Sequence, residues 1–205
     1  MKYNYLIYLI VIISILFRNP IINLINNFTN NFFLKNNNIE IKVLEEKNKI
    51  LIEEYQNLLD FKNNIKFEYN YTICNVMKNN YGFGNYIING DNYSIGDEVI
   101  NEKGLIGIIS KINNKTSEVK KIYNTNLIVK INNETGKIIT KDKDNNLIVK
   151  EISNYNDISL NDVVYSINNT YIGKIIKIKY DVLDNYLTVK TIDLDNIKYV
   201  AVISR

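Results

Sequence analysis

One pattern occurs twice in this chain, and the repeat limits the possible folds more than any other feature. The first copy runs from residues 95–100 into an apolar segment at 105–112, and the second, about 65 residues later, runs from 160–164 into 171–178. Each copy has the order turn, short strand, turn and glycine-containing strand. The sequence therefore predicts two related β-units, each of which folds on itself.

Six residues of this pattern are predicted to be structural. Glycine adopts positive φ without strain and allows another backbone to come close, whereas a short aspartate at a turn accepts a backbone N–H. The expected turn and close-approach residues are Gly96, Asp97, Gly104, Gly107, Asp162 and Gly173. We assign no catalytic role to either aspartate.

The C-terminal two thirds of the chain has a β-type sequence throughout. From residue 67 onward, short β-branched runs alternate with turns rich in Asn, Asp and Gly, and no helical period separates them. Such spacing is typical of antiparallel barrels and sandwiches. We predict a mainly β protein with a first six-stranded-type β-barrel or sandwich unit at 67–130 and a second at 131–205.

The N-terminal segment is apolar and is predicted to anchor the protein in a membrane. Residues 1–4 form a short cytoplasmic tail and 5–25 a transmembrane signal anchor, in which Arg18 snorkels and Pro20 introduces a kink. A cleavable signal peptide is the alternative, but no small-residue cleavage site follows. The short leading segment favours a cytoplasmic N-terminus and an extracytoplasmic remainder.

Residues 26–66 are predicted to form a coiled-coil stalk. Apolar residues recur at heptad spacing between charged flanks, and an asparagine at one core position would pair with its symmetry mate and favour a homodimer. The expected dimer seam is Ile41, Leu44, Asn48, Leu51, Tyr55 and Leu58. The alternative is a single amphipathic helix that packs on its own β-domain.

Composition argues against several functional classes. The net charge is only +3, and the Lys and Arg residues are scattered among Asp and Glu, so no basic stripe is available to bind nucleic acid. Histidine is absent, which removes the commonest metal ligand and general base, and the single cysteine excludes an intrachain disulfide. Asp193 and Asp195 are interpreted as a solvated strand edge. We therefore predict no enzyme activity, cofactor or metal site.

The order of anchor, coiled coil and two β-units resembles the MreC family of rod shape-determining proteins. The resemblance rests on the short motifs at 87–90, 95–100, 104–107, 160–166 and 171–175 and on a closing run at 189–194. The chain departs from the family where Asn161 replaces a usual glycine and Thr191 a usual proline. The loop between Ser166 and Tyr171 is also shorter than is usual.

This resemblance implies a membrane-anchored, non-enzymatic scaffold of the cell-elongation machinery. Such proteins dimerise and link the MreB cytoskeleton and the membrane protein MreD to peptidoglycan synthases, including a class B penicillin-binding protein and a RodA-type polymerase. The alternative function is a periplasmic adaptor of a membrane export system, a class that normally inserts a helical hairpin into a β-domain. A surface hydrolase is a third candidate, against which the missing histidine counts.

Overall fold

The computed structural model describes residues 5–9, 12–13, 17–65, 70–80, 84–181 and 184–204. The chain divides into two compact units, Met1–Asn57 and Leu58–Arg205, and each is described by itself. The predicted cytoplasmic tail at 1–4 lies outside the described residues.

Helix α2 (Arg18–Asn64) is continuous over 47 residues. Pro20 lies in its first turn, where a missing backbone N–H costs nothing, so the predicted kink within an apolar span is not observed. None of the described helical segments combines the length and the apolar character that crossing a bilayer requires. The predicted transmembrane helix is therefore not confirmed.

Most of the predicted dimer seam is exposed on α2. Ile41, Leu44, Leu51 and Tyr55 are 52–62% exposed in the single chain, and Asn48 is exposed as well. An apolar row of this kind has no partner within its own unit, but dimerisation itself stays a prediction. Leu58, the last member of the seam, is half-buried and belongs to the second unit.

The last turn of α2 contributes to the first barrel. Phe61 and Ile65 are buried, and the ring centroid of Phe61 lies 5.9 Å from that of Tyr199. The alternative of a helix packed on its own β-domain thus describes this turn, whereas the exposed seam residues from Ile41 to Tyr55 belong to the other unit.

Twelve described strands form two closed antiparallel barrels, which confirms the mainly β prediction. The first barrel has the order β1-β12-β3-β4-β5-β2 and the second the order β10-β11-β8-β7-β6-β9. The strands of the first are β1 (Tyr71–Asn80), β2 (Asn85–Asn89), β3 (Glu98–Asn101), β4 (Gly104–Asn113), β5 (Thr116–Lys121) and β12 (Tyr199–Ile203). Those of the second are β6 (Ile128–Ile131), β7 (Glu134–Lys141), β8 (Leu147–Lys150), β9 (Val163–Ser166), β10 (Tyr171–Lys179) and β11 (Tyr186–Thr191).

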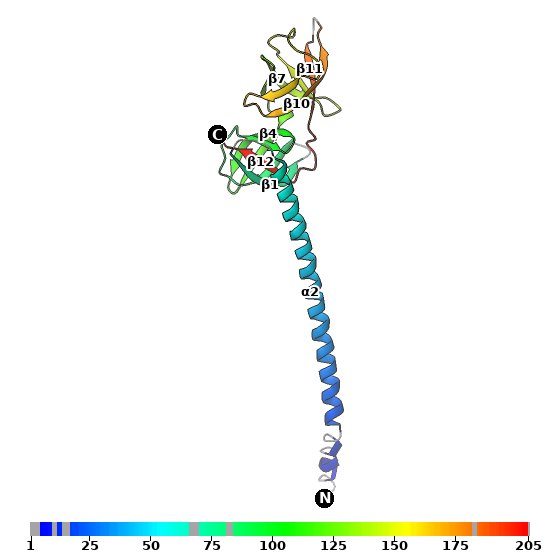
Figure 1. The fold of residues 1–205 in the computed structure, drawn as a ribbon. Helices are drawn as coiled ribbons and strands as arrows, with labels where there is room; N and C mark the ends of the chain where they lie inside the picture. Colours follow the sequence, from blue (N-terminus) through cyan, green and yellow to red (C-terminus); the bar gives the residue numbers. More distant parts are fainter. Residues whose placement is uncertain are drawn as a thin grey trace. The chain divides into compact units, whose positions relative to one another are not determined.

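The barrels differ from the predicted bounds at two places. Strand β6 begins at Ile128, before the expected boundary at 130/131, and β12 returns to the first barrel, where it pairs with β1 and β3. Figure 1 shows β12, in red, beside β1. The second barrel is thus contiguous in sequence, whereas the first is completed by the last strand of the chain.

The two barrels share one strand arrangement, in which five consecutive strands of each occupy equivalent places. In neighbour order, β1 to β5 of the first barrel correspond to β7 to β11 of the second, and β12 corresponds to β6. Even the irregularities match, since β1 and β7 each have a bulge in their pairing with the next strand, and so do β4 and β10. The two units are therefore versions of one barrel that differ in the source of the sixth strand.

Candidate functional site at the junction of the barrels

The repeated turn has the same hydrogen bonds in both barrels. Asp97 Oδ2 accepts the backbone N–H of Ser94 at 2.8 Å, and Asp162 Oδ2 accepts that of Ser159 at 2.7 Å. The residue before each aspartate is left-handed, with φ of +95° at Gly96 and +71° at Asn161. Asparagine tolerates this conformation better than most residues, which explains why Asn161 can stand where the first barrel has Gly96.

Three of the predicted turn glycines lie in strands. A Cβ on Gly107 would collide with the carbonyl oxygen of Lys120, and one on Gly173 with that of Lys190. The close approach of a neighbouring strand, rather than a turn, accounts for these two positions. Gly104 opens β4 and faces the carbonyl oxygen of Tyr171, which belongs to the other barrel.

The two barrels meet through equivalent hairpins, β3–β4 and β9–β10. Glu98, only 3% exposed, accepts hydrogen bonds across the junction from Thr170 Oγ1 to Oε2 and from Asn168 Nδ2 to Oε1, both at 2.6 Å. Ser166 Oγ accepts the N–H groups of Asn168 and Thr170 at 3.1 Å and so shapes the loop that supplies these donors. The shortened loop is thus used in an internal contact.

Two connecting segments also join the barrels. The first, residues 122–127, begins with the short 3-10 helix η1 (Ile122–Asn124), and the second, residues 192–198, leads from β11 to β12. The buried hydroxyl of Tyr86 donates a hydrogen bond to the carbonyl oxygen of Leu194. This bond fixes the second segment to the core of the first barrel.

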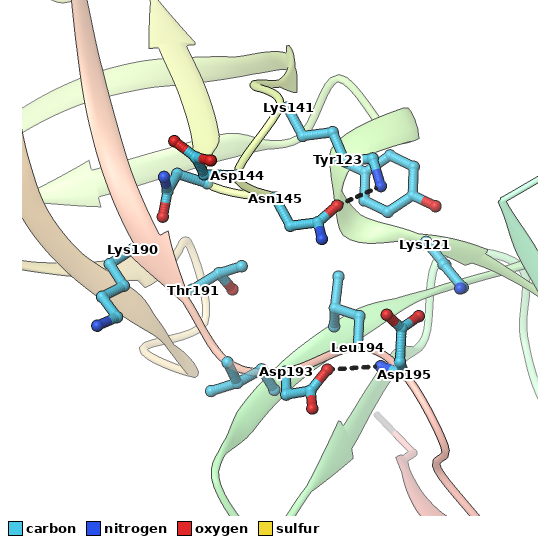
Figure 2. Close-up of a pocket in the computed structure, with 12 residues that line it drawn as sticks. Lys121, Tyr123, Lys141, Asp144, Asn145, Lys190, Thr191, Asp193, Leu194 and Asp195 are labelled. Carbon is cyan, nitrogen blue, oxygen red and sulfur yellow. Dashed lines mark hydrogen bonds between the residues drawn. The ribbon is translucent and has the colours of Figure 1, made fainter.

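A cleft of about 320 Å³ lies where these segments run (Figure 2). Its wall combines the end of β5 in the first barrel, the first connecting segment, the β7–β8 hairpin and the end of β11 in the second barrel, and the second connecting segment. Lysines, aspartates and two asparagines face it together with one tyrosine. The lining residues are Lys121, Tyr123, Lys141, Asp144, Asn145, Asn146, Lys190, Thr191, Ile192, Asp193, Leu194 and Asp195.

Burial shapes the electrostatics of the cleft. Burial lowers the pKa of Lys121, whose Nζ lies 4.4 Å from the ring centroid of Tyr86. Burial also raises the pKa of Tyr123, and the negative charge of Asp195 raises it further. Lys141 Nζ lies 4.4 Å from the ring centroid of Tyr123 and donates to Asn145 Oδ1 at 2.6 Å. The cleft thus offers ammonium donors, carboxylate acceptors and one aromatic ring.

Asp193 and Asp195 lie in the connecting segment rather than on a strand edge. The backbone N–H of Asp195 donates to Asp193 Oδ1 at 2.9 Å, and both residues line the cleft. Among the described residues, no group of three or more Cys, Asp or Glu side chains could hold a metal ion. Sequence reasoning missed Lys121 because only the chain path brings this residue to the cleft.

The family model of "Rod shape-determining protein MreC, barrel core" matches residues 87–204. The match covers more than half of the chain and strands of both barrels. This double-barrel chain belongs to the MreC family, as its motifs predict. No curated protein sequence matches it.

Solved structures share the fold. One described as MreC has a TM-score of 0.62 at 16% identity and covers 75% of this chain and 98% of its own. MreC of Listeria monocytogenes has a TM-score of 0.61 at 20% identity, covering 84% and 94%. MreC in a complex with Penicillin-Binding Protein PBP2 from Helicobacter pylori has a TM-score of 0.51 at 12% identity, covering 67% and 99%.

Proposed function

We propose that this protein is a membrane-anchored, extracytoplasmic scaffold of the cell-elongation machinery. The family match over both barrels supports a role in cell shape and carries the proposal. The N-terminal segment would anchor the chain, and the α2 seam would join two copies. The scaffold would connect MreB and MreD to peptidoglycan synthesis, with a class B penicillin-binding protein and a RodA-type polymerase as partners.

We further propose that the cleft at the barrel junction contacts the synthase. A Helicobacter pylori relative of the same fold has been solved with PBP2, which favours a class B penicillin-binding protein as the partner here. Lys141 is exposed on β7, lies beside the Tyr123 ring and lines the cleft, so its charge would meet a polar segment of that partner. Two copies in a dimer would strengthen a weak contact by avidity.

The test measures binding between this chain and the extracytoplasmic part of the class B penicillin-binding protein from the same cell, by interferometry. We expect saturable binding that Lys141→Glu weakens at least tenfold. Lys111→Glu makes the same charge change at an exposed position of β4 outside the cleft, and it should leave affinity unchanged. Equal loss in both variants would contradict the cleft assignment, and no binding by the folded chain would contradict the partner.

Dimerisation is tested at Asn48. Replacing a seam asparagine with leucine removes a buried polar group, so Asn48→Leu should raise the melting temperature and relax the preference for two strands. Light scattering of residues 26–205 over a dilution series, together with thermal unfolding, gives both quantities. A strictly monomeric wild-type chain, or a variant with unchanged mass and melting temperature, would contradict the seam.

A further inference from the structure

Glu98 occupies a position where the barrel itself does not need a carboxylate. The repeat aligns Asp97 with Asp162 and therefore Glu98 with Val163, the first residue of β9. The second barrel has half-buried Val163 at this place and is nevertheless a closed barrel. A buried carboxylate is costly unless it is hydrogen-bonded, so Glu98 must be explained by what its oxygens contact.

Two of those contacts lie in the other barrel. Both carboxylate oxygens accept short hydrogen bonds from the 167–170 loop, one from the Thr170 hydroxyl and one from the Asn168 amide. Hydrogen bonds to a charged acceptor are stronger than neutral ones and more directional than apolar packing. Beside them, Gly104 allows the backbone of Tyr171 to approach closely. Together these groups form a latch between equivalent hairpins, namely Glu98, Asn168 and Thr170.

The chain path gives this latch a mechanical role. The barrels are joined covalently by two segments, 122–127 and 192–198, and two attachments alone leave rotation about the line between them open. A third, non-covalent attachment is enough to stop that rotation. Because the cleft is lined by both barrels and both segments, its shape depends on the same rotation.

We propose that Glu98 is a positioning residue whose hydrogen bonds to Asn168 and Thr170 fix the angle between the barrels and thereby the shape of the cleft. The proposal deepens the proposed function, since it says what controls the synthase-binding site. It concerns geometry that exists in the free protein. Its test therefore needs no partner, and its failure is distinguishable from failure of the proposed function.

The experiment measures distances between spin labels on the full chain by pulsed electron paramagnetic resonance. Lys111→Cys and Lys177→Cys place labels at exposed, equivalent positions of β4 and β10. Labelled chains are diluted with unlabelled ones so that distances within one chain dominate. Native Cys74 is buried, and a sample without the introduced cysteines measures any labelling of it.

We expect one narrow distance distribution in the otherwise wild-type chain. Glu98→Val, the residue that the second barrel already has at this place, should at least double the width of the distribution, and Thr170→Val should broaden it less. Glu118→Gln is the matched control, because its carboxylate accepts from Asn85 within the first barrel. It should leave the width unchanged.

An unchanged distribution in folded Glu98→Val would overturn the proposal. If Glu98→Val does not fold, Thr170→Val decides in the same way, since it removes one donor and keeps the carboxylate. If Glu118→Gln broadens the distance distribution as much as the latch variants do, the proposal is also contradicted. The broadening would then come from a general destabilisation of the first barrel rather than from loss of the latch.

Discussion

The two barrels are built from the same five-strand arrangement but obtain their sixth strand from different places. In the second barrel, β6 lies immediately before β7 in sequence, so all six strands form one contiguous segment. In the first, the end of α2 precedes β1, and β12 supplies the missing strand after the whole second barrel. The comparison teaches that the same pattern of strand pairing can form whether the sixth strand is adjacent in sequence or follows a whole inserted barrel.

Removing β12 should give the largest difference between the barrels. Truncation after Lys198 deletes four buried side chains, from Val200 to Ile203, of which the three larger ones are each worth roughly 1.5–3 kcal/mol, and it opens β1 and β3. Amide hydrogen exchange should show lost protection in β1 to β5 and retained protection in β6 to β11. Removing only residues 204–205 is the control. Equal loss in both barrels would contradict independent folding of the second.

A second prediction compares Gly107 of β4 with Gly173 of β10. Gly107→Val and Gly173→Val should each destabilise their own barrel by about 3 kcal/mol, because a side chain meets the neighbouring backbone. Thiol labelling of Cys74, buried in the first barrel, reports which barrel opens. It should accelerate strongly for Gly107→Val and little for Gly173→Val. Similar acceleration by both would mean that the barrels unfold together.

The smallest effect is expected at the repeated turn. Asn161→Val should cost about 1–2 kcal/mol, because a β-branched residue is strained at φ of +71°. Asn161→Gly introduces the residue that the first barrel has at Gly96 and should be close to neutral. Denaturant unfolding of the second barrel measures both. Equal stability of the valine and glycine variants would show that the backbone at residue 161 leaves the left-handed conformation at little cost.

Much of the fold could be predicted because it follows from local patterns. The β-branched runs, the repeat and the family motifs each identify two barrel units from neighbouring residues alone. The placement of β12 could not be predicted, since the apolar run at 199–203 would suit a strand of either barrel. Only pairing with β1 and β3 decides its location.

The candidate site was harder to predict than the fold. Glu98 stands within a recognised motif, and its one signal in the sequence was a carboxylate directly before two β-branched residues. The structure buries all four residues of this strand. That burial and the partners in the 167–170 loop depend on how two equivalent hairpins meet, which no local pattern encodes. The cleft similarly combines segments that lie far apart in sequence, as Lys121 and Asp193 illustrate.

The return of β12 also sets the order in which the molecule can be finished during synthesis. At roughly 5–20 residues per second, several seconds separate the appearance of β5 from that of β12. During this interval the second barrel can close, whereas β1 and β3 still present unpaired edges. The nascent protein thus passes through a half-finished stage in which chaperones, or the last strand of a neighbouring chain, compete for the open position.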